Sequence, residues 1–200
     1  MQDIKCYFMP AADPPPMDRP LVRKGKAVSL GIHEREEIPA MYREFAGADV
    51  QKFLGRPDRL YYLESEYDWY DRLRKDDRSR VMAVLLNPDV AGVNSSYRLI
   101  GNVGIHGIHP VNRTAELGYL LFRDYWGKGY ATEAVSLAVD YAFETLNLRK
   151  LFARVFAPNG ASAAVLAKNG FVSAGRLSGQ LYIKSHGYVD EVYYELFRNH

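Results

Sequence analysis

The chain has 200 residues, of which 48% are hydrophobic, so its size and composition suit one globular domain and exclude a disordered chain. Its 26 basic and 24 acidic residues leave a net charge of only +2, which disfavours nucleic-acid binding as the main activity. The single cysteine, Cys6, excludes an intrachain disulfide and fits a cytoplasmic protein. The sequence has neither a signal-peptide pattern nor an apolar run long enough to span a membrane, so we expect no membrane partner.

The first twenty residues differ in composition from the rest. They contain five of the ten prolines, three of them consecutive at Pro14–Pro16, and proline restricts both its own φ and the residue before it. We predict that residues 1–20 form a proline-rich N-terminal arm and that residues 21–200 form a single domain.

In the first half of the chain, the patterning predicts short strands and amphipathic helices. Ile38, Met41, Tyr42 and Phe45 recur at helical spacing, with Pro39 near the start of the regular helix. The predicted elements are a strand over 26–32, a helix over 34–45, a short turn over 49–54, a helix over 67–75, a strand over 80–86, a loop over 88–96 and a glycine-interrupted strand over 97–108.

The second half is more regular. Asn147 suits the left-handed residue that stops a helix, and Pro158-Asn159-Gly160 breaks a strand. We predict strands over 115–122, 151–157, 171–176 and 189–197, a helix over 130–146 and a short helix over 162–169. Hairpins in the middle and strand–helix–strand units late in the chain predict an α+β fold with a mixed sheet.

The strongest chemical motif is a strand, a glycine loop and a helix, with the loop reading Trp126-Gly-Lys-Gly-Tyr-Ala-Thr-Glu133. Two glycines let the backbone turn its N–H groups toward one point, and the helix adds its positive end, so the pattern suits a pyrophosphate. A tight turn that only relieves strain is the alternative. A dinucleotide fingerprint fails because Thr132 stands where glycine or alanine is required, and a Walker A ending is absent.

The order of the later blocks carries a family resemblance. These blocks are Ala115-Glu-Leu-Gly-Tyr-Leu-Leu121, the loop at 126–134, Asp140-Tyr-Ala-Phe143, Ala153-Arg-Val155, Asn159 with Ala161-Ser162, and Lys168-Asn-Gly-Phe171. Together they resemble the GNAT superfamily of N-acetyltransferases, most closely its RimJ/RimL-like ribosomal-protein-alanine branch. The resemblance implies the GNAT fold, a mixed central sheet splayed between two parallel strands, here 117–122 and 151–156, and flanked by helices.

The resemblance also implies acetyl-CoA as co-substrate and a set of residues that bind it. Asp124 replaces the family's usual Gln or Arg, so we expect its side chain to point outward while Arg123 and Lys128 supply positive charge. The pyrophosphate would be held near the Thr132 hydroxyl by the backbone N–H groups of Trp126, Gly127, Lys128, Gly129, Tyr130 and Ala131. The pantetheine arm would pair with the backbone of Leu120, Leu121 and Phe122, and it would accept a hydrogen bond from Asn159.

For catalysis, an ammonium must first lose a proton, so acetyl transfer to an amine needs a base. Glu116 is the first candidate, with a solvated strand-end carboxylate as the alternative, and His106 and His109 are second candidates. By the resemblance, Ser162 would stabilise or protonate the departing thiolate, although Asn159 and Ser162 also suit a turn and a helix N-cap. The N–H of Leu121 would stabilise the oxyanion. The histidines form no metal-ligand cluster, so no metal is expected.

The acceptor amine would enter between the early helices and the loop 181–190. Candidate lining residues are Tyr61, Tyr62, Trp69, Tyr182 and Tyr188, with Glu64, Glu66 and Asp190 available to attract a cation. Peptide N-termini, polyamines and amino-acid-like or aminoglycoside amines all stay open, and so does a homodimer. A catalytically inactive acyl-CoA-binding module and a pure interaction domain are the alternatives to an enzyme.

Overall fold

The computed structural model describes residues 19–51, 60, 62–91, 96–183 and 185–198. The proline-rich arm up to residue 18, with Cys6, the end of the predicted turn at 49–54 and the side chain of Tyr61 lie outside the described residues. Within the described residues, no helix is both long and apolar enough to cross a membrane.

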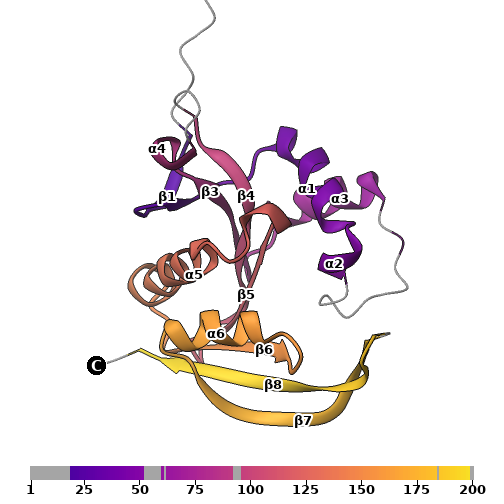
Figure 1. Ribbon diagram of the computed structural model, residues 1–200. Coiled ribbons are helices and arrows are strands. Elements are labelled where there is room, and N and C mark those ends of the chain that lie inside the picture. Colours follow the sequence, from indigo (N-terminus) through magenta and orange to yellow (C-terminus); the bar gives the residue numbers. More distant parts are fainter. Residues whose placement is uncertain (1–18, 52–59, 61, 92–95, 184, 199–200) are drawn as a thin grey trace, which may run out of the picture.

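One eight-stranded sheet organises the chain, in the order β1-β2-β3-β4-β5-β6-β8-β7 (Figure 1). Every neighbouring pair is antiparallel except β5 and β6, which run parallel. The strands are β1 Leu21–Lys24, β2 Val28–Gly31, β3 Arg80–Leu86, β4 Arg98–His109, β5 Thr114–Leu121, β6 Lys150–Phe156, β7 Val172–Ile183 and β8 Gly187–Phe197.

Helices cover both faces of the sheet, with α5 on one side of β3–β5 and α1 and α3 on the other (Figure 1). Val135, Ala138 and Leu166 from α5 and α6 pack on the apolar side of the central strands, whereas Met41 and Phe45 of α1 pack around Phe122 on the opposite face. The helices are α1 Ile38–Phe45, α2 Ala48–Gln51, α3 Leu63–Leu73, α4 Pro88–Ala91, α5 Tyr130–Asp140 and α6 Gly160–Lys168, with 3₁₀ turns at Arg35–Glu37 and Arg123–Tyr125 and a π-helical turn at Tyr141–Thr145.

The parallel strands β5 and β6 are paired only at one end. Their register joins Thr114 to Lys150, Ala115 to Leu151 and Glu116 to Phe152, and no pair follows. Beyond Glu116 the strands therefore separate while each keeps its other neighbour, β4 for β5 and β8 for β6. The predicted splay is present and opens from residue 117 onward.

Most predicted elements are confirmed, and the differences lie at turns and edges. The strand predicted over 26–32 is in fact the second arm of a hairpin, β1–β2, and the loop predicted over 88–96 begins with the short helix α4. Helix α3 starts at Leu63, four residues before its predicted start, and β7 runs to Ile183 because its pairing with β8 resumes at Leu181 after a register shift. Asn147 adopts φ +52°, the left-handed stop that was predicted.

Candidate active site

The loop before α5 is shaped by two left-handed glycines. Gly127 has φ +73° and Gly129 has φ +84°, a region in which a side chain is strained, and Gly129 immediately precedes the first helical residue, Tyr130. Apart from the adjoining residues of the loop, no atom lies within 4 Å of the position that a Cβ would take at either glycine. The loop therefore has its unusual conformation without any crowding that would explain it.

The same loop leaves a run of peptide donors without acceptors. The N–H of Trp126 donates to the carbonyl of Arg123 at 3.1 Å, and helical bonding begins where the N–H of Glu133 donates to Gly129 at 3.2 Å. Between these two points, the N–H groups of residues 127–132 have no acceptor within the described part of the chain. A helix start with free donors is an anion site, because the N–H groups and the helix dipole both favour negative charge.

The acidic side chain in the first turn of α5 is directed away from this site. The Glu133 carboxylate accepts hydrogen bonds from the backbone N–H groups of Lys26 and Ala27, at the turn between β1 and β2. This contact fixes α5 against the hairpin and removes a negative charge from the loop. Asp124 is exposed, as are Arg123 and Lys128, and the Lys128 ammonium lies 5.6 Å from the centre of the Tyr125 ring.

The open edge of β5 leads from the loop into the gap between β5 and β6. The N–H of Phe122 donates to Ile100 of β4 at 2.8 Å, so strand alternation turns the peptide groups of Leu121 to the opposite edge. The indole N–H of Trp126 accordingly donates to the Leu121 carbonyl on that side, at 2.7 Å. Of the three predicted pantetheine partners, Leu121 is the one whose N–H faces the gap, while Leu120 and Phe122 face β4.

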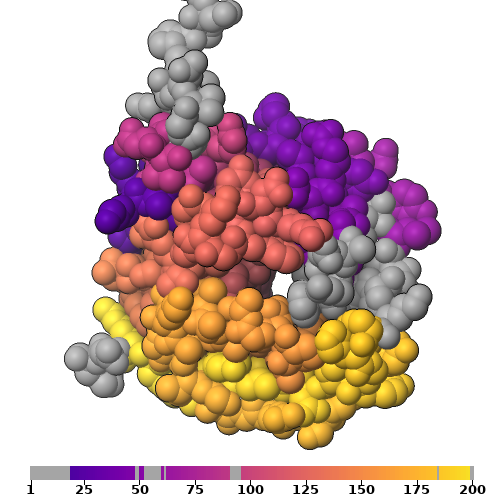
Figure 2. All heavy atoms as spheres, viewed as in Figure 1, coloured from indigo at the N-terminus to yellow at the C-terminus, as the bar shows by residue number. Residues whose placement is uncertain are grey.

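A polar pair bridges the gap from β5 to α6. The Tyr119 hydroxyl donates to the Ser162 carbonyl at 2.9 Å and lies 2.8 Å from the Ser162 Oγ. Burial raises the pKa of Tyr119 to about 12, so its hydroxyl carries a proton at neutral pH. Asn159 is the N-cap of α6: its Oδ1 accepts from the Ser162 N–H at 3.2 Å, which leaves its amide NH₂ free to donate. Figure 2 shows a hollow in the surface between the segments that carry these groups.

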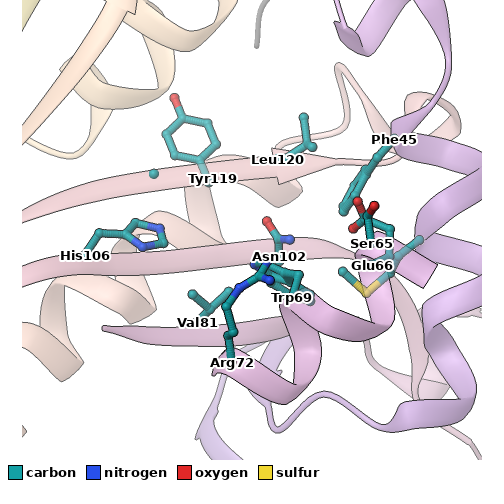
Figure 3. A pocket seen from close by; sticks show the side chains of 12 residues that line it. Phe45, Ser65, Glu66, Trp69, Arg72, Val81, Asn102, His106, Tyr119 and Leu120 are labelled. Atoms are coloured by element: carbon teal, nitrogen blue, oxygen red, sulfur yellow. The ribbon is translucent and has the colours of Figure 1, made fainter. Parts of the chain in front are cut away.

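On the other face of the sheet, a cavity of about 400 Å³ lies between the helices α1 and α3 and the strands β3, β4 and β5 (Figure 3). Its wall contains Trp69 and Glu66 of α3, and the Glu66 side chain is largely buried. Tyr119 and Gly118 of β5 also line it, so the cavity reaches the strand that borders the gap. The lining residues are Met41, Phe45, Ser65, Glu66, Trp69, Arg72, Val81, Asn102, His106, Gly118, Tyr119 and Leu120.

His106 lies in this cavity over two glycines. Gly104 and Gly118 are register partners, and a Cβ at Gly104 would come within 2.2 Å of the His106 Nε2, with 3.7 Å at Gly118. The ring therefore occupies space that a side chain at position 104 would fill, whereas a Cβ at position 118 would make an ordinary contact with it. Burial lowers the pKa of His106, against the opposing effects of Glu116 and Asp76, so the imidazole is neutral at pH 7.

Glu116 is the register partner of His106 and is held in an ion pair. Arg154 of β6 donates to both of its carboxylate oxygens, at 2.8 and 3.2 Å, and the same guanidinium lies 3.6 Å from Glu191. Hydrogen bonding to Glu116 raises the pKa of Arg154. Glu116, the first candidate for the base, is thus next to a residue that lines the cavity, and its oxygens are engaged by a cation.

The remaining predicted residues divide between the cavity and other places. Trp69 and Glu66 line the cavity, whereas Tyr182 and Tyr188 stack edge to face on the β7–β8 hairpin and are 51% and 77% exposed. Asp190 accepts hydrogen bonds from Gly179 and Arg176, which lower its pKa. The second candidate His109 accepts a bond from the Asn112 N–H in a turn and is not among the cavity-lining residues.

Sequence reasoning did not assign roles to Tyr119, Asn102, Arg72 or Arg154. Tyr119 could have been found from strand alternation, because it faces the side opposite Gly118 and Leu120 on β5. The other three depend on packing between elements far apart in sequence. In the described part of the chain, no group of His, Cys, Asp or Glu is arranged to hold a metal ion.

A loop of free peptide donors beside two diverging parallel strands defines an anion site at the mouth of a splayed sheet, and comparison with known proteins identifies the family that has this arrangement. Residues 30–172 match the acetyltransferase (GNAT) domain, and the chain therefore belongs to this family. The expected GNAT fold is confirmed.

Individual relatives match over different lengths. YoaA, an uncharacterized N-acetyltransferase of Bacillus subtilis (strain 168), is 38% identical over 95 residues, which are 48% of this chain and 54% of that protein. The chain thus spans little more than half the length of this relative. Spermidine N(1)-acetyltransferase of Escherichia coli (strain K12) is 30% identical over 157 residues, covering 78% of this chain and 79% of that protein.

A solved structure extends the similarity of the fold. Spermidine N-acetyltransferase from Vibrio cholerae, in complex with CoA and spermine, superposes with a TM-score of 0.76 at 22% identity, over 86% of this chain and 96% of that one.

Proposed function

We propose that this protein is an acetyl-CoA-dependent N-acetyltransferase that moves an acetyl group to a primary amine by direct attack in a ternary complex. The observation that carries the proposal is the run of unpaired N–H groups at residues 127–132, at the mouth of the gap between β5 and β6. A pyrophosphate would accept from this run, and the pantetheine arm would extend along the open edge of β5 like an added strand.

The cofactor roles follow from this placement. Backbone N–H groups of residues 127–131 hold the pyrophosphate, with the Thr132 hydroxyl nearby, while Lys128 and Arg123 add positive charge at the exposed rim. Trp126 leaves the predicted set of donors, because its N–H already donates to the Arg123 carbonyl. The amide of Asn159 donates to the pantetheine, since its oxygen already caps α6. The N–H of Leu121 faces the gap and stabilises the thioester oxyanion.

The reaction joins an amine nitrogen to the thioester carbon and breaks the carbon–sulfur bond. A base takes one proton from the ammonium before attack, and the departing thiolate takes a second proton as the amide forms. Ser162, bonded to the protonated Tyr119 hydroxyl, lies at the gap where that thiolate would leave. Tyr119 keeps Ser162 in place, and the proton that the amine nitrogen loses as the amide forms replaces the one that Ser162 gives to the thiolate.

Two groups are proposed for the base. Glu116 is at the start of the splay, but Arg154 engages both of its oxygens. His106 is neutral at pH 7 and lines the cavity between α1, α3 and the sheet, which we assign to the acceptor and call the acceptor cavity. We therefore place the proton on His106 or on a water between it and Glu116, with Glu116 holding the resulting imidazolium.

Family branch and domain limits are also part of the proposal. The quoted motifs favour the RimJ/RimL-like branch, without fixing the acceptor that the branch name suggests. Residues 21–200 form the acetyltransferase domain, and the arm over residues 1–20 is attached to it at Arg19, which donates to Glu37 and to the Ile32 carbonyl.

Two measurements test the function. Calorimetric titration with acetyl-CoA should give a saturable isotherm, and thiol release should rise when a panel of primary amines is added. No binding at millimolar acetyl-CoA would refute the proposal. Binding without thiol release from any amine would instead identify an inactive acyl-CoA-binding module.

A further inference from the structure

The acceptor cavity has an unpaired positive charge at its rim, where Arg72 is exposed to solvent. Arg72 of α3 lines the cavity, and Figure 3 shows its guanidinium extending toward the Asn102 side chain of β4. Within the described residues, this guanidinium has no hydrogen-bond acceptor, carboxylate or aromatic ring as a partner. A guanidinium with five donors is the side chain best suited to bind a carboxylate through two parallel bonds.

The position of Arg72 in the helix does not by itself explain this arrangement. Cations are favoured in the last turn of a helix by its dipole, and Arg74 has the same advantage. Arg74, however, lies over the Tyr70 ring at 5.9 Å and does not line the cavity. Asp68, four residues earlier on α3, is the helical neighbour that could pair with Arg72, and in the described residues the two form no ion pair.

The charges around the cavity do not suit a polycation. Glu66 is the single carboxylate among the lining residues that the structure describes, and it already has an interaction of its own. His106 is neutral at pH 7, so Arg72 offsets the charge of Glu66 and leaves the lining near neutrality. A ligand with several ammonium groups would have one counter-ion and would be repelled by the guanidinium.

The polar groups of the cavity are spaced for a small molecule. The His106 ring folds back over Gly104, and Gly104 is two residues from Asn102 on the same face of β4. At the usual rise of a strand, the ring and the Asn102 side chain are separated by roughly 7 Å. An amine near His106 and an acidic group near Asn102 and Arg72 would therefore be only a few bonds apart.

We infer that the acceptor is an amino-acid-like amine whose carboxylate binds Arg72 and Asn102 while its amine lies beside His106, toward the thioester. This inference rests on the proposed acetyltransferase function and specifies its substrate class. Trp69 supplies an apolar wall between the two polar ends. Arg72 is thus a specificity-determining residue that selects for the carboxylate.

Matched pairs of acceptors test the inference. Leucine, methionine, phenylalanine and glutamate are each compared with their α-carboxamides, and spermidine is included as the polycation. We expect kcat/KM to be at least tenfold higher for the preferred amino acid than for its amide, and spermidine to be poorer than both. Arg72→Gln should remove this ratio without changing the Kd of acetyl-CoA, whereas Arg74→Gln should preserve it.

The outcomes separate the inference from the proposed function. Equal or better rates with the amides or with spermidine, or a ratio that survives Arg72→Gln, would overturn the inference and leave the acetyltransferase activity intact. Calorimetric titration of each acceptor pair into the CoA complex adds a readout that needs no turnover. Carboxylate-selective binding that depends on Arg72, without acetylation, would support the site and refute the activity. If the acceptors show neither carboxylate-selective binding nor turnover, the inference is overturned.

Discussion

Gly129 offers a test of the pyrophosphate site in which charge is separated from shape. The residue has φ +84°, and a Cβ there would meet no atom within 4 Å, so substitution adds backbone strain but no clash. Asn and Asp both tolerate the left-handed region better than other side chains, so Gly129→Asn and Gly129→Asp should each destabilise the fold by about 1 kcal/mol or less. At this chain length that shift corresponds to a Tm change of about 2–4 °C.

The two variants differ in one negative charge, which would stand beside the pyrophosphate. Two unit charges about 5 Å apart in the effective dielectric of a protein surface interact by about 2–3 kcal/mol. Gly129→Asp should therefore bind acetyl-CoA about 30- to 100-fold more weakly than Gly129→Asn, as measured by calorimetry at low ionic strength. Added salt should reduce the difference. Equal affinities for the two variants, with both proteins folded, would show that no anion binds at this helix start.

Three further predictions concern catalysis and acid stability. Ser162→Ala should lower kcat about tenfold or more while the Kd of acetyl-CoA changes little; the reverse pattern would make Ser162 a structural residue. His106→Gln should remove the acid limb of the pH profile of kcat/KM below pH 6.5, whereas Glu116→Gln should only displace that limb. An acid limb unchanged in His106→Gln would exclude His106 as the base. His33 is 3% exposed, and burial lowers its pKa from 6.5 to about 4, so the unfolded chain takes up a proton between these values that the folded chain does not. Unfolding in urea should therefore show a loss of about 2 kcal/mol between pH 7 and pH 5 that is absent in His33→Phe, and parallel pH curves would contradict the burial argument.

Local patterns were sufficient to predict the elements whose conformation is set by neighbouring residues. The apolar run of β3 was placed at Arg80–Leu86, and the glycine loop was placed directly before α5. The strand β1 was missed because its four residues form a strand only through pairing with β2. Helix α4 was missed because Asn87-Pro88-Asp89 reads as a turn, and a single helical turn uses the same residues.

For the site, the sequence predicted the loop formed by consecutive residues. It did not predict the contacts between side chains on different strands and helices, which depend on how these elements are aligned. The loop at 126–132 carries its geometry within seven residues, so its two glycines and the helix start were enough. The contact between Tyr119 and Ser162 joins residues 43 positions apart, and the pair of Glu116 with Arg154 joins residues 38 apart. Only the relative position of β5, β6 and α6 brings these groups together, and no local pattern contains that information.

The short pairing between β5 and β6 has a mechanical consequence. Three residue pairs at Thr114–Glu116 provide the strand-to-strand connection between a five-stranded leaf and a three-stranded leaf. A cofactor lying in the gap would contact both leaves where the backbone supplies no contact between them, and would hold the two leaves together. Free energy from cofactor binding would then appear as resistance of the gap to opening, so amide protons along the divergent halves of β5 and β6 would be the ones whose exchange slows most on binding.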